Sequence, residues 1–171
     1  SGIIDEDTLN RHLKYKNRKN KCLIYFKKRP IGDLEKVTNF LNDKNIDYEV
    51  FHYGQYANKD LIRSALNSKF GIFMSRPETQ GFAAQELLSC NIPLIVWDQK
   101  TNYYEDLILS GTTMSYWSND CGLIVDTFEE LKFQFDVFIE NLHKFQPINL
   151  IKEHLTYEKF KKNLKYEFEH F

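Results

Sequence analysis

Two glutamates that flank a glycine-containing turn are the residues of this chain best suited to hold a ligand. Glu78 lies eight residues before Glu86, and Gly81 stands between them. Free backbone N–H groups at a helix that starts at Gly81 suit a phosphate. Ionised carboxylates repel an anion but are strong acceptors for hydroxyl groups. The pattern therefore predicts a ligand that carries both a phosphate and hydroxyl groups.

A second group of candidates follows an apolar run at residues 22–26. Lys27, Lys28 and Arg29 come directly after this run, which is typical of a buried parallel strand. Positive side chains at that position can neutralise a diphosphate that becomes a leaving group. Arginine suits bidentate contact with a phosphate, and lysine acts as a point charge. A solvated loop cluster is the competing interpretation for each of the three.

Further candidates lie near the ends of other apolar runs. Arg76 precedes Pro77 and is placed to reach a phosphate, with a surface ion pair as the alternative. Tyr53 or Tyr56 can stack on a base, although an aromatic side chain at a strand end more often packs at the edge of the core. Asp98 follows the run at residues 93–97 and is a further candidate for lining a pocket.

The elements that must position these residues alternate along the chain. Strands are expected at residues 22–26, 48–53, 70–74, 93–97 and 122–125. Helices are expected at 33–44, 58–66, from Gly81 onward, at 103–109, after a cap at Thr127, at 148–154 and at 156–169. Such alternation predicts a parallel sheet of five to six strands flanked by helices in one Rossmann-like α/β domain. Turns after its strands lie at the carboxyl edge, where ligands bind.

Glu78, Gly81, Glu86 and Pro93, with the flanking strands in this order, resemble the donor-site motif of retaining glycosyltransferases with the GT-B fold, in particular glycosyltransferase family 4. The similarity extends over most of the chain, from residue 56 through the expected strand at 120–126 to the helical pattern at 155–168. The resemblance implies one half of a GT-B fold, namely the C-terminal domain that binds the nucleotide sugar.

The resemblance also implies roles for the residues of the motif. Glu86 should bind the ribose hydroxyls of the nucleotide, and Glu78 should contact hydroxyls of the donor sugar. Backbone N–H groups would be offered to sugar and phosphate by Thr79, Gln80, Gly81 and Phe82. Many members of the family have Gly-Phe-Gly after the first glutamate, so Thr79-Gln80-Gly81 is a departure at the donor sugar.

The family usually has an arginine after the first strand and a lysine five residues later. Arg29 matches the first position, but residue 34 is leucine, so Lys27 or Lys28 would take the second role. The family also has a glycine-containing loop near the base, which Gly54 and the neighbouring Tyr56 resemble.

The implied reaction moves a sugar from a nucleoside diphosphate to an acceptor with retention of anomeric configuration. The donor is a substrate, and neither a metal nor a further cofactor is expected. A sugar, a lipid-linked or a protein acceptor would be bound through an N-terminal domain for which this chain has no room. A nucleotide-sugar epimerase and a non-catalytic binding module are the alternatives. The base, the sugar and the acceptor stay open.

Composition bounds the remaining possibilities. The chain has 171 residues, 42% of them hydrophobic, and a net charge of −1, which predicts one folded domain and no nucleic-acid partner. No apolar stretch has the length of a membrane span. The three cysteines have no metal-ligand spacing, and we expect buried, reduced thiols in a cytoplasmic protein that could still attach to a membrane surface. Residues 1–20 are expected to be a linker or tag-derived start, and 21–171 the domain.

Overall fold

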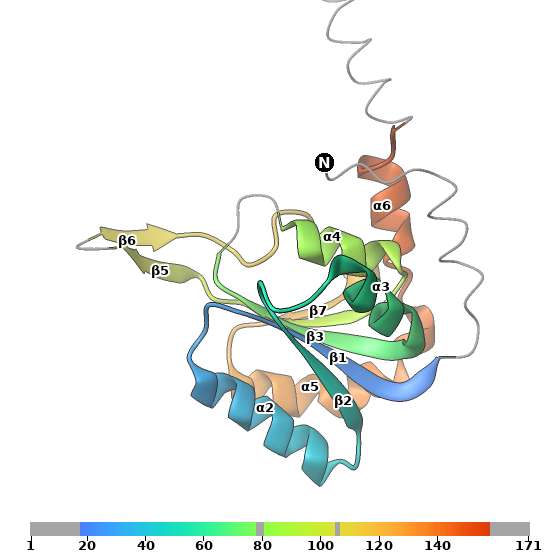
Figure 1. Cartoon of the computed structure of the whole chain (residues 1–171), viewed down its shortest axis with the longest axis horizontal. Coiled ribbons are helices and arrows are strands. Elements are labelled where there is room, and N and C mark those ends of the chain that lie inside the picture. The colour runs from blue at the N-terminus through green and yellow to red at the C-terminus, as the bar shows by residue number, and fades with distance from the viewer. Residues whose placement is uncertain (1–17, 78–80, 105–106, 158–171) are drawn as a thin grey trace, which may run out of the picture.

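A five-stranded parallel sheet with helices on both faces forms the domain (Figure 1). The computed structural model describes residues 18–77, 81–104 and 107–157. The strands are β1 (Lys19–Lys27), β2 (Asp47–His52), β3 (Ser68–Ser75), β4 (Leu94–Trp97) and β7 (Gly122–Val125), in the spatial order β2-β1-β3-β4-β7. The single α/β domain with a parallel sheet that the sequence predicts is thereby confirmed.

The order of the strands reverses between β1 and β3. The chain passes outward from β1 to β2 and then returns across β1 to form β3. At the carboxyl edge, Lys27 of β1 is in register with Ser75 of β3. Ligands of doubly wound sheets bind in the crevice that such a reversal opens. The residues that follow Lys27 and Ser75 are therefore the first place to look for a site.

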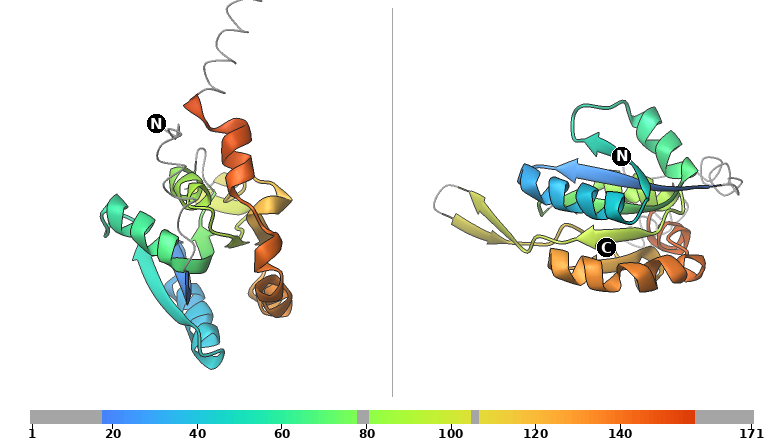
Figure 2. Two further views of the ribbon diagram at one scale, coloured as in Figure 1. Left: turned by 90° about the vertical axis from the view of Figure 1, so that its right-hand side faces the viewer. Right: turned by 90° about the horizontal axis from the view of Figure 1, so that it is seen from below.

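Two helical layers cover the sheet. On one face lie α2 (Ile31–Asp43) and α5 (Phe128–Glu140). On the other lie α3 (Asn58–Asn67), α4 (Phe82–Ser89) and α6 (Ile148–His154), as Figures 1 and 2 show. Because both faces are covered, the central strands are apolar throughout instead of alternating with polar residues.

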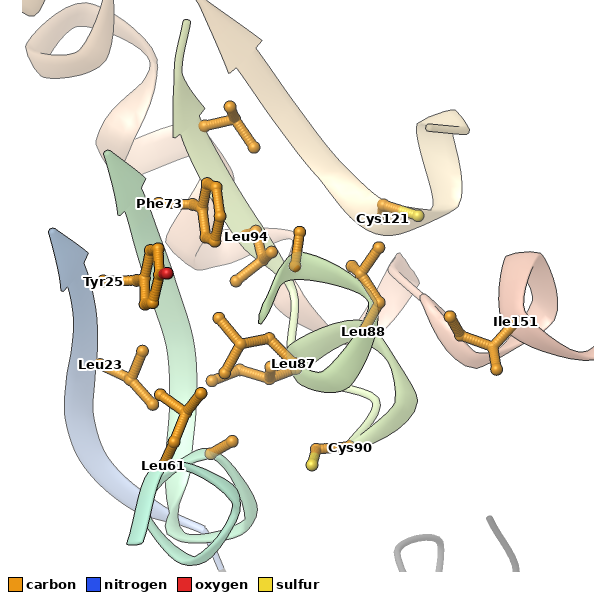
Figure 3. Close-up of a cluster of buried hydrophobic side chains, with 14 of the residues drawn as sticks. Leu23, Tyr25, Leu61, Phe73, Leu87, Leu88, Cys90, Leu94, Cys121 and Ile151 are labelled. Atoms are coloured by element: carbon orange, nitrogen blue, oxygen red, sulfur yellow. The ribbon is translucent and has the colours of Figure 1, made fainter. Parts of the chain in front are cut away.

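Alternate residues of each strand enter two separate cores. In β1, Leu23 and Tyr25 face α3 and α4, whereas Ile24 faces α2 and α5. The Tyr25 ring stacks on Phe73 of β3, with centroids 4.7 Å apart (Figure 3). All of these side chains are almost completely buried. The stack fixes β1 against β3 close to the point where the strand order reverses.

Thr127 caps α5 as the sequence predicts. Its hydroxyl accepts a hydrogen bond from the Glu130 backbone N–H at 3.1 Å. The Glu130 carboxylate accepts one from the backbone N–H of Asp126 at 2.7 Å. The first bond satisfies a donor that the first turn of a helix leaves without an intrahelical partner, and the second holds the residue before the cap.

The prediction of a helix at residues 103–109 is wrong. An antiparallel hairpin occupies this region, formed by β5 (Thr101–Tyr104) and β6 (Leu107–Ser110), and it projects from the main sheet (Figure 1). Its residues include two tyrosines and the run Leu-Ile-Leu, and short apolar runs of this kind fit a strand as well as a helix. Of the last expected helix, residues 158–169 lie outside the described part of the chain.

The first strand of the sheet begins before residue 21. β1 starts at Lys19, and the Arg18 guanidinium donates hydrogen bonds to the backbone oxygens of Ser68 and Cys90. The segment expected to be a linker therefore contributes its last residues to the fold. Residues 1–17 lie outside the described part of the chain.

The three cysteines are buried and form no disulfide, as expected. Burial raises the pKa of the Cys90 thiol to about 12, so this sulfur stays protonated at neutral pH. In the described ranges, no cluster of three or more His, Cys, Asp or Glu side chains has the arrangement of a metal site. None of the helices in those ranges combines the length and the apolar character needed to cross a membrane.

Candidate functional site

Most of the described candidate residues lie near the carboxyl ends of β1, β2 and β3. Lys27 closes β1, and Arg76 follows the end of β3 at the reversal of strand order. Gly81 then precedes α4 at the same edge of the sheet. Glu78, Thr79 and Gln80 lie outside the described residues, so the structure does not place them.

Glu86 is half-buried in the second turn of α4 and faces the start of α3. Its Oε1 accepts a hydrogen bond from Asn58 Nδ2 at 2.9 Å. Burial raises the pKa of Glu86, and the bond from Asn58 acts in the opposite direction. A carboxylate can accept about four hydrogen bonds, so this bond leaves acceptor capacity for a ligand. Asn58 begins the helix expected at residues 58–66, and no local sequence pattern indicates a bond to a residue 28 positions away.

The start of α4 has the backbone expected of a ligand-binding turn. Gly81 adopts a left-handed conformation with φ +60° and ψ +41°, which costs a glycine little and most other residues more. The first N–H groups of the helix that follows lack intrahelical partners. The next side chain, Phe82, is 46% exposed. The helix start thus combines N–H donors with an exposed aromatic ring.

The loop after β2 separates the two candidate tyrosines. Tyr53 is 53% exposed, and the Lys27 ammonium lies 4.3 Å from its ring centroid. Tyr56 instead packs against the core, edge-on to Phe51 with centroids 5.5 Å apart. Gly54 between them has φ +78° and open space around its Cα. Tyr53 is therefore the tyrosine better placed to stack on a ligand.

Arg29 turns away from the other basic residues and is held within the domain. Its guanidinium bonds Asp33 at 2.9 Å and the backbone oxygen of Trp97 at 2.7 Å. It also stacks over the Trp97 ring at 4.3 Å, and its side chain is 5% exposed. Lys28, just before it, is exposed and has φ +53°, an uncommon conformation for a residue with a long side chain. Of the two residues, Lys28 is the one open to a ligand.

A hollow of about 400 Å³ lies beside Arg29 at the carboxyl ends of β1, β4 and β7. Its charged groups are paired with one another: Arg29 with Asp33, and Lys100 with Asp126. The residues that line it are Arg29, Asp33, Trp97, Asp98, Gln99, Lys100, Thr101 and Asp126. Because its cations already have carboxylate partners, this hollow is less suited to an anion than the edge around Gly81.

Asp98, expected as a pocket residue, accepts an unusual number of internal hydrogen bonds. Its carboxylate takes the backbone N–H groups of Thr113 at 2.6 Å and Gln99 at 2.9 Å, and the Thr112 hydroxyl at 3.2 Å. The side chain is almost completely buried. Asp98 therefore organises the loop that follows the hairpin, a role that no local sequence pattern indicated.

Comparison with known proteins finds one partial similarity. No family model and no solved structure matches it. Glucan 1,3-beta-glucosidase I/II of Saccharomyces cerevisiae (strain ATCC 204508 / S288c) is 32% identical to it over 85 residues. The aligned region is 50% of this chain and 19% of the yeast protein, so the chain spans about a fifth of that protein. The α/β domain thus has a partial similarity to a carbohydrate-active enzyme.

Proposed function

We propose that this domain binds a nucleoside-diphosphate sugar at the carboxyl edge of its sheet and serves as the donor half of a retaining glycosyltransferase. The observation that carries the proposal is the placement of Glu86. Its half-buried carboxylate is oriented by Asn58 and lies in the helix that starts at Gly81. A carboxylate in the second turn of a helix whose start suits a phosphate is placed for the hydroxyls of a nucleotide's ribose.

The diphosphate has suitable partners at the same edge. Backbone N–H groups at the start of α4 favour an anion, as does the helix dipole. Lys27 ends β1 and Lys28 follows it, and Arg76 follows the neighbouring end of β3. Positive charge and N–H donors that stabilise a departing diphosphate contribute to catalysis without a metal. Tyr53 is available at the rim to stack on a base.

Transfer to an acceptor needs more than this domain. Glu78 would contact the donor sugar, and a second domain would hold the sugar, lipid-linked or protein acceptor. Two domains that close on both substrates supply orientation and exclude water, which are large terms in group transfer. We therefore expect the chain by itself to bind the donor weakly and to transfer the sugar poorly.

The similarity to a glucosidase favours glycoside hydrolysis as a second candidate. Hydrolysis requires two carboxyl groups, about 5–9.5 Å apart, on either side of the glycosidic bond. Glu86 has the raised pKa of a potential acid. Three aspartates at the carboxyl edge of the sheet, Asp33, Asp98 and Asp126, are already bonded within the domain. Donor binding therefore accounts for the arrangement better than hydrolysis does.

The decisive experiment is a calorimetric titration of the purified chain with UDP, GDP, ADP and their sugar conjugates. Glu86→Gln should weaken binding of the preferred nucleotide by about 1–3 kcal/mol, as expected for the loss of a charged hydrogen bond. Glu140→Gln is the matched control, because Glu140 is exposed at the far end of α5. Equal losses in both variants would contradict the assignment of Glu86.

Product analysis separates the competing functions. The chain by itself is incubated with the preferred nucleotide sugar and, separately, with a β-1,3-glucan. Any longer native form of the protein is treated in the same way. A glycoside product supports transfer, whereas an epimerised or free sugar released from the nucleotide supports an epimerase. Glucose released from the glucan supports hydrolysis. Binding without any product supports a non-catalytic module, and absence of nucleotide binding by every form overturns the proposal.

A further inference from the structure

A buried set of hydrogen bonds joins the end of β4 to the end of β3. Asp98, immediately after β4, accepts hydrogen bonds from the backbone N–H of Thr113 at 2.6 Å and of Gln99 at 2.9 Å. The Thr113 hydroxyl accepts from the same Gln99 N–H at 3.2 Å and donates to the backbone oxygen of Ser75 at 3.0 Å. Ser75 is the last residue of β3.

This network lies in the interior and has little freedom to rearrange. Thr113 and Ser75 are fully buried, and Asp98 is 6% exposed. Buried polar groups that lose a partner carry a desolvation cost, so each member tends to hold the others in one geometry. The Ser75 backbone oxygen in particular accepts a hydrogen bond from the hydroxyl of a residue 38 positions away in the chain.

A second contact joins the loop after the hairpin to the chain that follows β3. Gly111 lies against Pro77, which follows the Ser75–Arg76 corner, and a Cβ atom at Gly111 would come within 2.9 Å of the Pro77 Cβ. The Gly111 backbone N–H also donates to the Lys100 backbone oxygen at 2.9 Å, which closes the base of the hairpin. The loop therefore contacts both the beginning and the continuation of the chain after β3.

We propose that Thr113, held by Asp98, is a positioning residue that sets the path of the chain where it leaves β3 at Ser75, Arg76 and Pro77. Its hydroxyl holds Ser75, and Gly111 supports Pro77, so that Arg76, which lies between them, is held in one direction as it leaves β3. The name of the ligand rests on the proposed function, whereas the geometric effect on this corner does not. Thr113 touches no substrate and acts through Ser75.

Three variants of the full chain test the proposal. Thr113→Val keeps the shape of the side chain and removes the hydroxyl, whereas Thr113→Ser keeps the hydroxyl. Thr112→Val is the matched control, because the Thr112 hydroxyl bonds Asp98 at 3.2 Å and the Met114 N–H at 3.2 Å, with Ser75 bonded by Thr113 instead. Amide resonances and exchange rates are recorded for Arg76, Gly81 and Phe82, and UDP, GDP and ADP are titrated separately.

We expect Thr113→Val to shift and accelerate exchange of the Arg76 amide, and to weaken binding of the preferred nucleotide about tenfold, since small displacements of a binding group have effects of this order. Thr113→Ser should restore both properties, and Thr112→Val should leave the affinity within about twofold of the original. These results together support the positioning role.

Two outcomes would overturn it. If the Arg76 amide is unchanged in Thr113→Val, the hydroxyl does not set this corner, whatever the protein binds. If the amide shifts but Thr113→Ser fails to restore it, or Thr112→Val weakens binding equally, the effect is general loss of packing. Should the original chain bind none of the three nucleotides, the proposed function fails, and the amide data alone then decide the positioning of the corner.

Discussion

Two regions at the carboxyl edge of the same sheet carry charged groups in different ways. In the hollow beside Arg29, Arg29 and Lys100 each form an ion pair with a carboxylate of the domain. Around Gly81 and Glu86, the half-buried carboxylate has a neutral amide as its described partner, and Lys28, which follows β1 at the same edge of the sheet, is exposed. A charged group that is paired and hydrogen-bonded inside the protein belongs to the fold. A charged group that can still accept or donate hydrogen bonds is available to a ligand. The number of charges at an edge is therefore a poorer guide to a site than their partners are.

The largest effect should come from Arg29. Arg29→Met keeps apolar contact with Trp97 but leaves Asp33 without its buried partner. Loss of one member of such a pair should lower the free energy of unfolding by about 3 kcal/mol, or the melting temperature by about 6–12 °C for a chain of this size. Lys36→Met is the control, since Lys36 is 58% exposed and 4.0 Å from the same aspartate. Similar melting temperatures for both variants would remove the distinction between the two regions.

A substitution at Glu86 should affect ligand binding and leave stability almost unchanged, in contrast to one at Arg29. Glu86→Gln should change the free energy of unfolding by less than about 0.5 kcal/mol, because the amide oxygen can still accept from Asn58 and the carboxylate is only half-buried. The same variant should reduce nucleotide affinity about tenfold or more. Chemical denaturation and calorimetry of one preparation measure both. A variant that is strongly destabilised and binds normally would place Glu86 with the structural charges.

The pH dependence of binding sharpens this difference further. Burial raises the folded-state pKa of Glu86 above its ordinary value of 4.5, so binding that needs the ionised carboxylate should weaken at a pH above that value as the solution is acidified. The folded state then holds more protons than the unfolded chain, and this group's contribution to stability falls as the pH rises from 4.5 through the folded pKa. Titrations between pH 4 and 8 should show the acid limb, which Glu86→Gln should flatten. An identical limb in the variant would assign it to another group.

The smallest effect should be found at Lys100. Its ammonium pairs with Asp126, but 64% of the side chain is exposed, and exposed pairs are screened by water and salt. Lys100→Met should leave the melting temperature almost unchanged at moderate ionic strength, in contrast to Arg29→Met. A large drop would mean that the hollow beside Arg29 depends on its exposed pair as well as its buried one.

The main sheet was predictable because most of its strands have a recognisable pattern in the sequence. Residues 22–26, 70–74 and 93–97 are continuous apolar runs, and burial on both faces is the reason that parallel strands read this way. The cap at Thr127 was equally visible, since a hydroxyl followed three residues later by a glutamate forms a local pattern. The carboxyl-edge position of the Gly81 turn follows from the same alternation of strands and helices.

The hairpin and the partners of the charged residues were not predictable in this way. Residues 101–110 contain an apolar run without a glycine or proline turn signal, and such a run is ambiguous between helix and strand. Arg29 was expected at the diphosphate, yet it bonds the Trp97 oxygen 68 positions away. The Glu78–Gln80 part of the motif lies outside the described residues, and its role stays a prediction.

The amino-acid sequence by itself determined the fold class, the strands of the main sheet and the edge of that sheet at which the candidate residues lie, because burial and capping leave patterns among neighbouring residues. Only the tertiary structure decided which charges are available there. It paired Glu86 with Asn58, turned Arg29 into the domain and joined Thr113 to Ser75. These are contacts between residues distant along the chain, and their geometry depends on how the whole sheet and its helices pack.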